Sequence, residues 1–241
     1  MEAARWAAHG ARPALLDNFR SGPDRRVALA RYARLAAHYE ESARRIRDVR
    51  GRAIDLLHLK SGETVFDVAC GAGATLDELA RQVGPQGRVI GIEQSPEMAA
   101  LARAAAGGSE NVQVLCDPVE TFSSPHRADA LLFCYTHDVL QSAPALSNLF
   151  AQTRMGARIA VAGLCLLPWW GALANAWVLW RARDYLTTWR GLREPWLSLL
   201  AWCPDLSIFG RCHLGTSYLA AGTLSVARRA TLRCAAMRRS V

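Results

Sequence analysis

The stretch VFDVACGAGATL, residues 65–76, decides the fold of this 241-residue chain. Apolar, β-favouring residues lead to Asp67, glycines follow at Gly71 and Gly73, and an apolar spacing of helical period begins near Leu76. This order predicts a strand, a tight turn and the N-terminus of a helix. In such a turn the backbone N–H groups can approach a bound molecule closely, so we expect both glycines to face a ligand.

The same stretch indicates which ligand is expected. A dinucleotide fingerprint needs a third glycine, and Leu76 occupies its position, which disfavours NAD or FAD. The residues instead resemble the cofactor loop of class I S-adenosylmethionine-dependent methyltransferases of the small-molecule, UbiE-like type, in which an acidic residue ends the first strand before a GxG loop. The resemblance covers residues 62–163. Ala69 stands where the family most often has its first glycine, and we expect it to have a negative φ.

Composition restricts the class of protein. With 51% hydrophobic and 21% charged residues, the chain can build a packed core, and its length suits one large domain with an appended lid. The net charge of +8 comes from arginine, since Lys60 is the only lysine; it fits nucleic acid, an anionic membrane surface, acidic substrates or simply a GC-rich genome. Seven cysteines without a CxxC pair, and no apolar secretory segment at the N-terminus, predict a cytoplasmic protein.

Strand-like and helix-like segments alternate beyond the loop. The strand-like segments are VFDVAC at 65–70, RVIGIE at 88–93, VQVLC at 112–116, ADALLFCYT at 128–136 and RIAVAGLCL at 158–166, with a turn at 155–157 before the last. Apolar strands separated by helices predict an α/β, doubly wound, mostly parallel sheet covered on both faces. The resemblance implies a seven-stranded, Rossmann-like sheet, whose last two strands, one antiparallel, we place in residues 205–229.

The chain is expected to divide at about residue 60. Residues 1–60 are predicted to form an N-terminal arm and helical lid, with helices that begin after Asp24 and break or bend near Gly51. Residues 61–241 are predicted to form the core, with a tryptophan-rich lid insertion at about 168–204. Tyr32 and Tyr39 lie on one helical face, which fits core packing; by resemblance to other lids, Tyr39 is the candidate to line the active site.

Acidic residues at strand ends carry the cofactor interpretation. The resemblance implies that Asp67 faces the methionine ammonium, that Glu93 accepts the two ribose hydroxyls, and that Asp117 accepts from the adenine amino group. The next residue usually gives its N–H to adenine, but Pro118 has none, so adenine recognition must use Val119, water or nothing. The further cofactor-binding candidates are Ala69, Cys70, Gly71, Gly73, Gln94, Met98, Cys134 and Tyr135.

The end of the fourth strand, CYTHDVLQ, is expected near the reactive sulfonium, because ligands bind outside the carboxyl ends of such strands. His137 is a candidate general base and Thr136 a candidate substrate-binding residue. His137 could equally be a hydrogen-bonded residue that shapes the loop, since methyl transfer from a sulfonium can proceed by positioning alone. His58, His126 and His213 lack metal-ligand spacing, and we predict no metal site.

The most ambiguous segment is IAVAGLCLLPWWGALANAWVLW, residues 159–180, which carries no charge. Its length would allow a membrane span, but Pro168, Gly171 and Asn175 favour a strand, a turn and then an apolar lid helix. The tryptophans of this insertion could form a satellite core, a substrate pocket, a dimer face or a lipid contact. We expect Trp169 and Trp170 to line the pocket and Trp177 to pack in a core.

The sequence therefore predicts S-adenosylmethionine-dependent methyl transfer to a small, apolar or aromatic metabolite with an oxygen or nitrogen acceptor. No feature typical of nucleic-acid methylation, such as an NPPY-like motif, follows the fourth strand. Two alternatives remain open: a membrane-associated enzyme that methylates a phospholipid amine, and a regulatory protein that binds the cofactor without catalysis. A homodimer is a further expectation, while membrane contact is the less favoured one.

Overall fold

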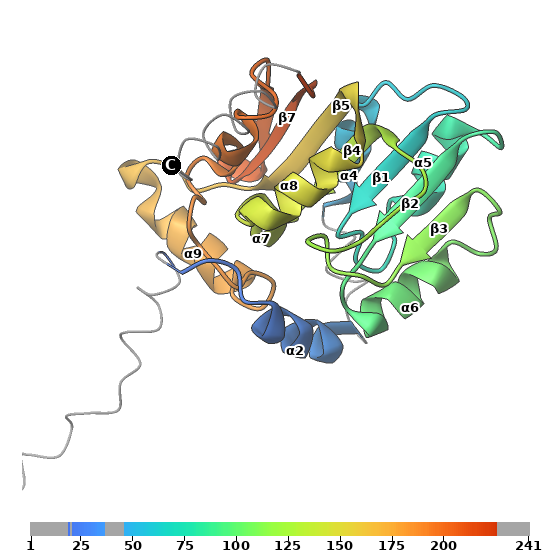
Figure 1. Ribbon diagram of the computed structural model, residues 1–241. Helices are drawn as coiled ribbons and strands as arrows, with labels where there is room; N and C mark the ends of the chain where they lie inside the picture. The colour runs from blue at the N-terminus through green and yellow to red at the C-terminus, as the bar shows by residue number, and fades with distance from the viewer. Residues whose placement is uncertain (1–18, 20, 37–45, 226–241) are drawn as a thin grey trace, which may run out of the picture.

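A computed structural model describes residues 19, 21–36 and 46–225 (Figure 1). Its centre is a seven-stranded sheet in the order β3-β2-β1-β4-β5-β7-β6. The strands are β1 (Thr64–Val68), β2 (Arg88–Ile92), β3 (Val112–Leu115), β4 (Ala128–Cys134), β5 (Thr153–Leu164), β6 (Ser207–Cys212) and β7 (Ser217–Thr223). The first five pair in parallel, and β7 is antiparallel to both of its neighbours. The predicted doubly wound, mostly parallel sheet is confirmed.

Helices cover both faces of the sheet. They are α2 (Arg25–Leu35), α4 (Arg47–Asp55), α5 (Leu76–Val83), α6 (Pro96–Ala105), α7 (His137–Leu140), α8 (Ala143–Ala151) and α9 (Ala172–Ala182), with the 3-10 turns η2 (Trp169–Gly171), η3 (Pro195–Leu199) and η4 (His213–Gly215). Several helix starts follow from local chemistry. Asp24 accepts from the N–H groups of Arg26 and Val27, and Ser95 caps α6, which has Pro96 in its first turn.

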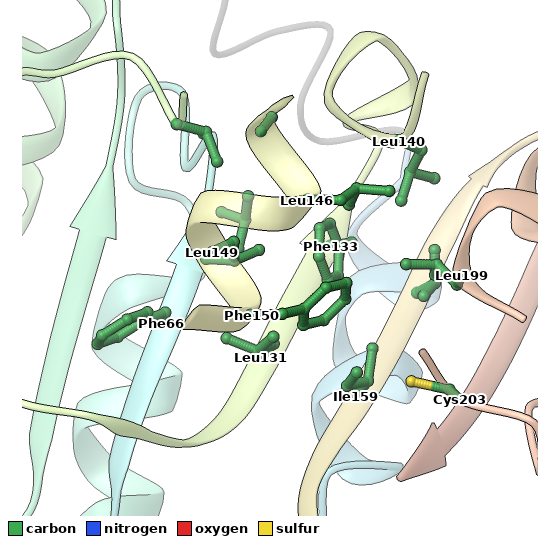
Figure 2. Packing of buried hydrophobic residues seen from close by; sticks show 14 of the residues in the cluster. Phe66, Leu131, Phe133, Leu140, Leu146, Leu149, Phe150, Ile159, Leu199 and Cys203 are labelled. Atoms are coloured by element: carbon green, nitrogen blue, oxygen red, sulfur yellow. The ribbon is translucent and has the colours of Figure 1, made fainter. Parts of the chain in front are cut away.

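The period of two along each strand divides the core between the two faces. Phe66 and Phe133 point to one face, where they meet Leu149 and Phe150 of α8 (Figure 2). Val65 points to the other face and joins a second cluster with residues of α4 and α5. Burial of large apolar side chains on both faces explains why these strands read as apolar runs.

Two boundaries differ from the sequence predictions. Gly51 lies inside α4, so the expected break there is wrong: Val49, Ala53 and Ile54 are buried against the sheet, and this packing outweighs the roughly 1 kcal/mol that glycine costs a helix. Because α4 belongs to the core, the described part of residues 1–60 is not only a lid. The expected turn at 155–157 is instead an irregularity inside β5, between its pairing at Thr153 and its pairing at Arg158.

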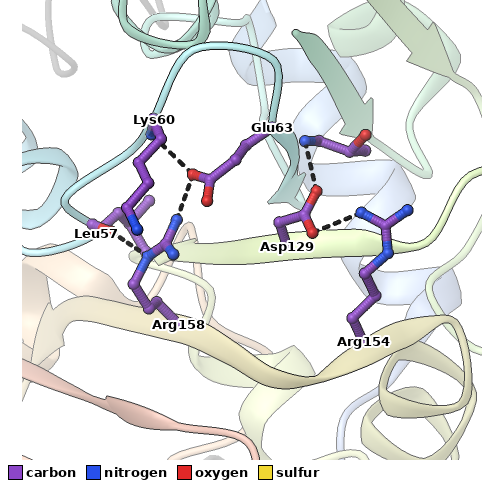
Figure 3. Close-up of polar contacts among 7 residues, drawn as sticks. Leu57, Lys60, Glu63, Asp129, Arg154 and Arg158 are labelled. Atoms are coloured by element: carbon purple, nitrogen blue, oxygen red, sulfur yellow. Dashed lines mark hydrogen bonds and ion pairs between the residues drawn. The ribbon is translucent and has the colours of Figure 1, made fainter.

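Charged side chains join the strands at the amino ends of β1, β4 and β5 (Figure 3). Arg158 is paired with Glu63 and donates to the backbone oxygen of Leu57 at 2.6 Å. Asp129 accepts from the N–H of Thr64 at 2.9 Å and from Arg154 at 2.5 Å. These ion pairs therefore fix the edge of the sheet that lies opposite the strand ends where a ligand is expected.

The insertion between β5 and β6 has two environments. Trp196, Leu199 and Cys203 join the main core, whereas Val178 and Trp189 belong to a separate third cluster. Asp138 ties this region to the end of β4 by accepting from the N–H groups of Thr187 and Thr188. Within the described residues, no helix combines the length and apolarity needed to cross a bilayer.

Candidate active site

The residues that follow the carboxyl ends of β1 and β4 form sharp turns at the site. Ala69 after β1 has φ 54°, and Tyr135 after β4 has φ 58°. The left-handed conformation costs a non-glycine residue about 1–2 kcal/mol, and such strain is typical of functional sites. The expectation that Ala69 has a negative φ is wrong, because its φ is 54°.

Asp67 is buried beneath this turn, with 1% of its surface exposed. Its carboxylate accepts the hydroxyl hydrogen of Thr75, the residue that precedes α5. Burial raises the pKa of Asp67 to about 6, although Thr75 and the charge of Arg50 act in the opposite direction. A cationic ligand group nearby would favour ionisation of this carboxylate.

Glu93, at the end of β2, is also buried, and its two oxygens fix the loops on either side. One oxygen accepts from the N–H of Gly71 at 3.0 Å and the other from the N–H of Ser95 at 2.8 Å. Burial raises the pKa of this carboxyl, and the backbone donors lower it. The backbone N–H of Gln94 also acts on this carboxylate, which has about four lone-pair sites and so keeps capacity to accept from a ligand hydroxyl.

Three cavities lie at this edge of the sheet. The small cavity, about 60 Å³, is lined by Ala28, Tyr32, Ala69, Gly71, Glu93, Gln94, Cys134, Tyr135, Thr136, His137, Asp138, Val139, Tyr185 and Leu186. A third cavity of about 100 Å³ includes Ala69, Gln94 and Val119. The structure thus brings together Ala69, Gly71, Glu93, Gln94, Cys134, Tyr135, Thr136, His137 and Val119 from the predicted site.

Other predicted cofactor residues lie outside these cavities. Asp67, Cys70, Met98, Asp117 and Pro118 line none of the three cavities, and Asp117 is exposed. Packing requires glycine at position 73, because a Cβ there would lie 2.9 Å from Cα of Ala102 in α6. A backbone contact between Gly73 and the ligand stays a prediction.

His137 has a defined tautomer. Its Nε2 lies 2.9 Å from the backbone oxygen of Arg190, and because a carbonyl only accepts, Nε2 carries the hydrogen. Burial lowers the pKa of His137 to about 4, so the ring is neutral at pH 7. This geometry favours a role of His137 in shaping the loop over a role as general base.

Two buried polar atoms near the small cavity, Nδ1 of His137 and Oγ1 of Thr136, have no hydrogen-bond partner among the described residues. Their free hydrogen-bonding capacity suits a polar ligand in this cavity.

The large cavity, about 430 Å³, adjoins the small one and shares Tyr32, Tyr135, Tyr185 and Leu186 with it. Its other lining residues are Ile46, Arg50, Leu164, Trp177, Val178, Arg181, Ala182, His213, Leu214, Thr216 and Ser217. The lining is mainly apolar, with two arginines and no carboxylate. Its volume lies in the range of about 300–1,000 Å³ that is typical of small-molecule sites.

The expected roles of the tryptophans are reversed. Trp169 and Trp170 are 83% and 65% exposed and line none of the three cavities, so their predicted place in the pocket is wrong. Trp177, expected in a core, lines the large cavity. The turn η2 carries residues 169 and 170 past the strand end before α9 returns over the site. Tyr39 lies outside the described residues; Tyr32, seven residues earlier, lines both cavities.

Comparisons with known proteins agree with this site. The model of a methyltransferase domain matches residues 65–156, which include the Asp67 loop, Glu93 and the end of β4. Residues 65–156 therefore form a methyltransferase domain, and the chain is similar to class I S-adenosylmethionine-dependent methyltransferases. The cofactor of this family is S-adenosylmethionine.

Two curated relatives, both methyltransferases by name, match part of this chain. Aklanonic acid methyltransferase DauC from Streptomyces sp. (strain C5) is 38% identical over 79 residues, which are 32% of this chain and 36% of DauC. A 2-phytyl-1,4-naphtoquinone methyltransferase from Thermosynechococcus vestitus is 31% identical over 111 residues, 45% of this chain and 49% of that protein. The chain thus spans less than half the length of either relative.

A solved structure supports the fold of the methyltransferase. The S-adenosylmethionine-dependent methyltransferase from Aquifex aeolicus superposes with a TM-score of 0.54 at 21% identity, over 73% of this chain and 89% of that one. At this identity the likeness establishes the fold alone.

Proposed function

We propose that this methyltransferase transfers the methyl group of S-adenosylmethionine to a small, apolar or aromatic metabolite. The observation that carries the proposal is the pair of adjoining cavities that share Tyr135: a small one at the cofactor loop that includes Glu93, and a larger, mainly apolar one beside it. Both relatives described above are named for small organic substrates, aklanonic acid and a naphthoquinone.

The residues of the small cavity would hold the cofactor. Glu93 would accept the ribose hydroxyls, the ammonium would lie toward Asp67, and Gln94 and Val119 line the third cavity. At about 60 Å³ the small cavity is below the range typical of a ligand site, and Ala28 and Tyr32 of α2 form part of its wall. Binding would therefore require α2 to move outward, which makes this helix the lid.

The two alternatives differ from this proposal in measurable ways. A regulatory protein would bind S-adenosylmethionine without consuming it, and an enzyme on phospholipid amines would transfer labelled methyl groups into phospholipid. The absence of a metal ion from the reaction stays a prediction. A cytoplasmic location, a homodimer and the absence of a nucleic-acid partner stay predictions.

The test is methyl incorporation from labelled S-adenosylmethionine into metabolite extracts, with cofactor affinity measured in parallel by calorimetry. The proposal predicts incorporation into an organic-soluble small molecule and loss of cofactor binding in Glu93→Ala. Cofactor binding without incorporation into any pool would support the regulatory alternative, and incorporation into phospholipid would support the membrane-associated one.

A further inference from the structure

A chain of polar side chains leads from the large cavity to solvent. The Tyr135 hydroxyl lies 3.1 Å from Oγ of Ser217, and Oγ of Ser217 lies 3.2 Å from Nδ1 of His213. On the other side of the ring, Nε2 of His213 faces Oδ1 of Asp48 at 4.0 Å. The four residues come from the end of β4, the start of β7, η4 and α4, and the first three line the large cavity.

The hydrogen bonds of this series can all point the same way, from Tyr135 toward His213. Because the Asp48 carboxylate can only accept, it favours the His213 tautomer with hydrogen on Nε2, which leaves the Nδ1 lone pair for the Ser217 hydroxyl. Ser217 Oγ can then accept the hydrogen of Tyr135. A lone pair of the Tyr135 oxygen remains for a hydrogen donated from the cavity. Burial raises the pKa of Tyr135, so its phenol stays neutral and can relay a proton.

Exposure increases along the same path. Ser217 is buried, whereas the side chains of His213 and Asp48 are 41% and 66% exposed. The backbone is strained at both ends of the hydrogen-bonded part, with φ 58° at Tyr135 and φ 50° at His213. Left-handed conformations at two non-glycine residues have an energetic cost, and they aim these two side chains at Ser217 from opposite sides.

We propose that the methyl acceptor is a hydroxyl group of the molecule in the large cavity, and that its proton leaves through Tyr135, Ser217 and His213. This inference rests on the proposed function and identifies the acceptor class. The acceptor oxygen forms a bond to the methyl carbon as the carbon–sulfur bond breaks and its electron pair goes to sulfur. The hydroxyl proton passes to Tyr135 oxygen, the Tyr135 proton to Ser217 and the Ser217 proton to His213 Nδ1, where Asp48 faces the resulting imidazolium.

A hydroxyl uses such a chain better than an amine does. A neutral amine attacks with its lone pair and can lose its proton to water after the product has left. A hydroxyl is a weak nucleophile unless its proton is removed during attack, and a positioned relay of this kind contributes roughly 10²–10⁴-fold. His137 lines the small cavity and not the large one, and its Nε2 is bonded to Arg190, so it does not take part in this chain.

The first test needs no acceptor. Nitrogen-15 NMR of the ring of His213, assigned with His213→Ala, should show the hydrogen on Nε2 in the wild type. Hydrogen on Nδ1 would overturn the proposal, because the chain could not then carry a proton toward the ring. If the protein methylates no model acceptor, the position of this hydrogen on the His213 ring decides whether the proposed proton path stands.

The second test uses 2-naphthol and 2-naphthylamine as matched model acceptors with S-adenosylmethionine. Tyr135→Phe, Ser217→Ala and His213→Ala should each lower kcat for the naphthol by roughly 10²-fold, a much larger loss than for the amine. Ser217 and His213 do not line the small cavity, so cofactor affinity should be kept in their two variants. Added imidazole should restore the naphthol activity of His213→Ala but not of Ser217→Ala, because only the histidine is open to solvent. A merely structural role for His213 would show no such rescue.

Tyr218→Phe is the matched control. Tyr218 follows Ser217 but points to the opposite face of the sheet, and its buried hydroxyl has no partner among the described residues. Its loss should leave naphthol turnover unchanged. The proposal fails if Ser217→Ala keeps the wild-type kcat for the naphthol, or if only the amine is methylated. Failure of the wild type to bind S-adenosylmethionine would instead overturn the proposed function.

Discussion

The Thr75 hydroxyl donates a hydrogen bond to the buried carboxylate of Asp67, and so joins the end of β1 to the start of α5. Thr75 precedes α5 but makes no side-chain bond to the helix, because its hydroxyl is used for Asp67. A carboxylate held in this way at the cofactor loop links stability and cofactor affinity to the same proton.

Asp67 should make stability fall as the pH rises toward 6. Its pKa is raised to about 6 in the folded protein from 3.8, so the stabilisation is complete below about 4 and is lost as the pH rises through 6. The change is on the order of 3 kcal/mol. Urea unfolding of Asp67→Asn should lack this dependence, whereas Asp77→Asn, an exposed acid in α5, should keep it.

The same proton should govern cofactor affinity if Asp67 faces the methionine ammonium. A nearby cation favours the ionised carboxylate, so binding should release a proton and strengthen as the pH rises through 6. Calorimetry in buffers of different ionisation enthalpy measures the protons released. No proton release in the wild type, or an unchanged release in Asp67→Asn, would contradict this placement of the ammonium.

His137 should make stability rise with pH, over nearly the same pH interval in which Asp67 makes it fall. Burial lowers the pKa of His137 to about 4 from 6.5. The stabilisation that the neutral ring contributes is therefore present above pH 6.5 and is lost as the pH falls through 4. NMR titration of the ring C–H signal should give a midpoint near 4. A midpoint close to 6.5 would mean that the ring is solvated, and it would reopen the general-base interpretation.

Gly73→Ala should destabilise the fold more than its strained φ alone explains. Gly73 and Gly108 have nearly the same φ, 81° and 82°, but a Cβ at Gly73 meets Ala102 at 2.9 Å, whereas at Gly108 it meets nothing within 4 Å. Each alanine should cost about 1–2 kcal/mol for the backbone. Gly73→Ala should cost about 1–3 kcal/mol more for overpacking, measured by denaturant unfolding of the pair. Equal losses would show that the turn yields without strain.

The sequence predicted the sheet and its loops because the signals there are local. Asp67, Gly71 and Glu93 each follow their own strand, and parallel pairing brings strand ends to one edge whatever the details of packing. The period of apolar residues likewise predicts which faces are buried, and Figure 2 shows those residues in the core. The turn at Ala69 has φ 54°, and the next residue is held by a hydrogen bond from the N–H of Cys70 to the backbone oxygen of Ile92 at 3.1 Å.

The large cavity could not be predicted in the same way. Ser217 and His213 meet Tyr135 only because β7 inserts next to β5 in the antiparallel direction, and no spacing in the sequence encodes that contact. Similarly, Trp169 and Trp170 follow a strand that points toward the site, but the direction of η2 after that strand decides which tryptophan reaches the cavity. The one usable signal was the shared helical face of Tyr32 and Tyr39.

The exposed face of α9 should be an interaction surface rather than a core. Leu173, Trp177 and Trp180 form an apolar patch at helical spacing, with 90%, 59% and 56% of their surfaces exposed. Trp169 and Trp170, in the turn η2 that precedes α9, are 83% and 65% exposed. Because they are exposed, the double change Trp169→Ser, Trp170→Ser should alter the free energy of unfolding by no more than about 0.5 kcal/mol per site.

Trp196→Ala is the contrasting variant. Trp196 is 8% exposed and packs against Tyr218 with ring centroids 4.9 Å apart, so its loss should cost roughly 3–5 kcal/mol. A large loss of stability in the double serine variant would show that the patch is covered by another part of the chain.

The partner of the α9 face should be an anionic lipid surface. Arg181 lies 6.0 Å from the ring centroid of Trp177 and Arg183 lies 5.2 Å from that of Trp180, so positive charge and tryptophan are combined on one helix, as in proteins that bind lipid headgroups. Co-sedimentation with phosphatidylglycerol vesicles should exceed that with phosphatidylcholine, weaken with salt and be lost in the double serine variant, while Leu101→Ser on α6 keeps it. If instead the double variant changes the sedimentation coefficient without any vesicle binding in the wild type, the face joins two copies of the chain.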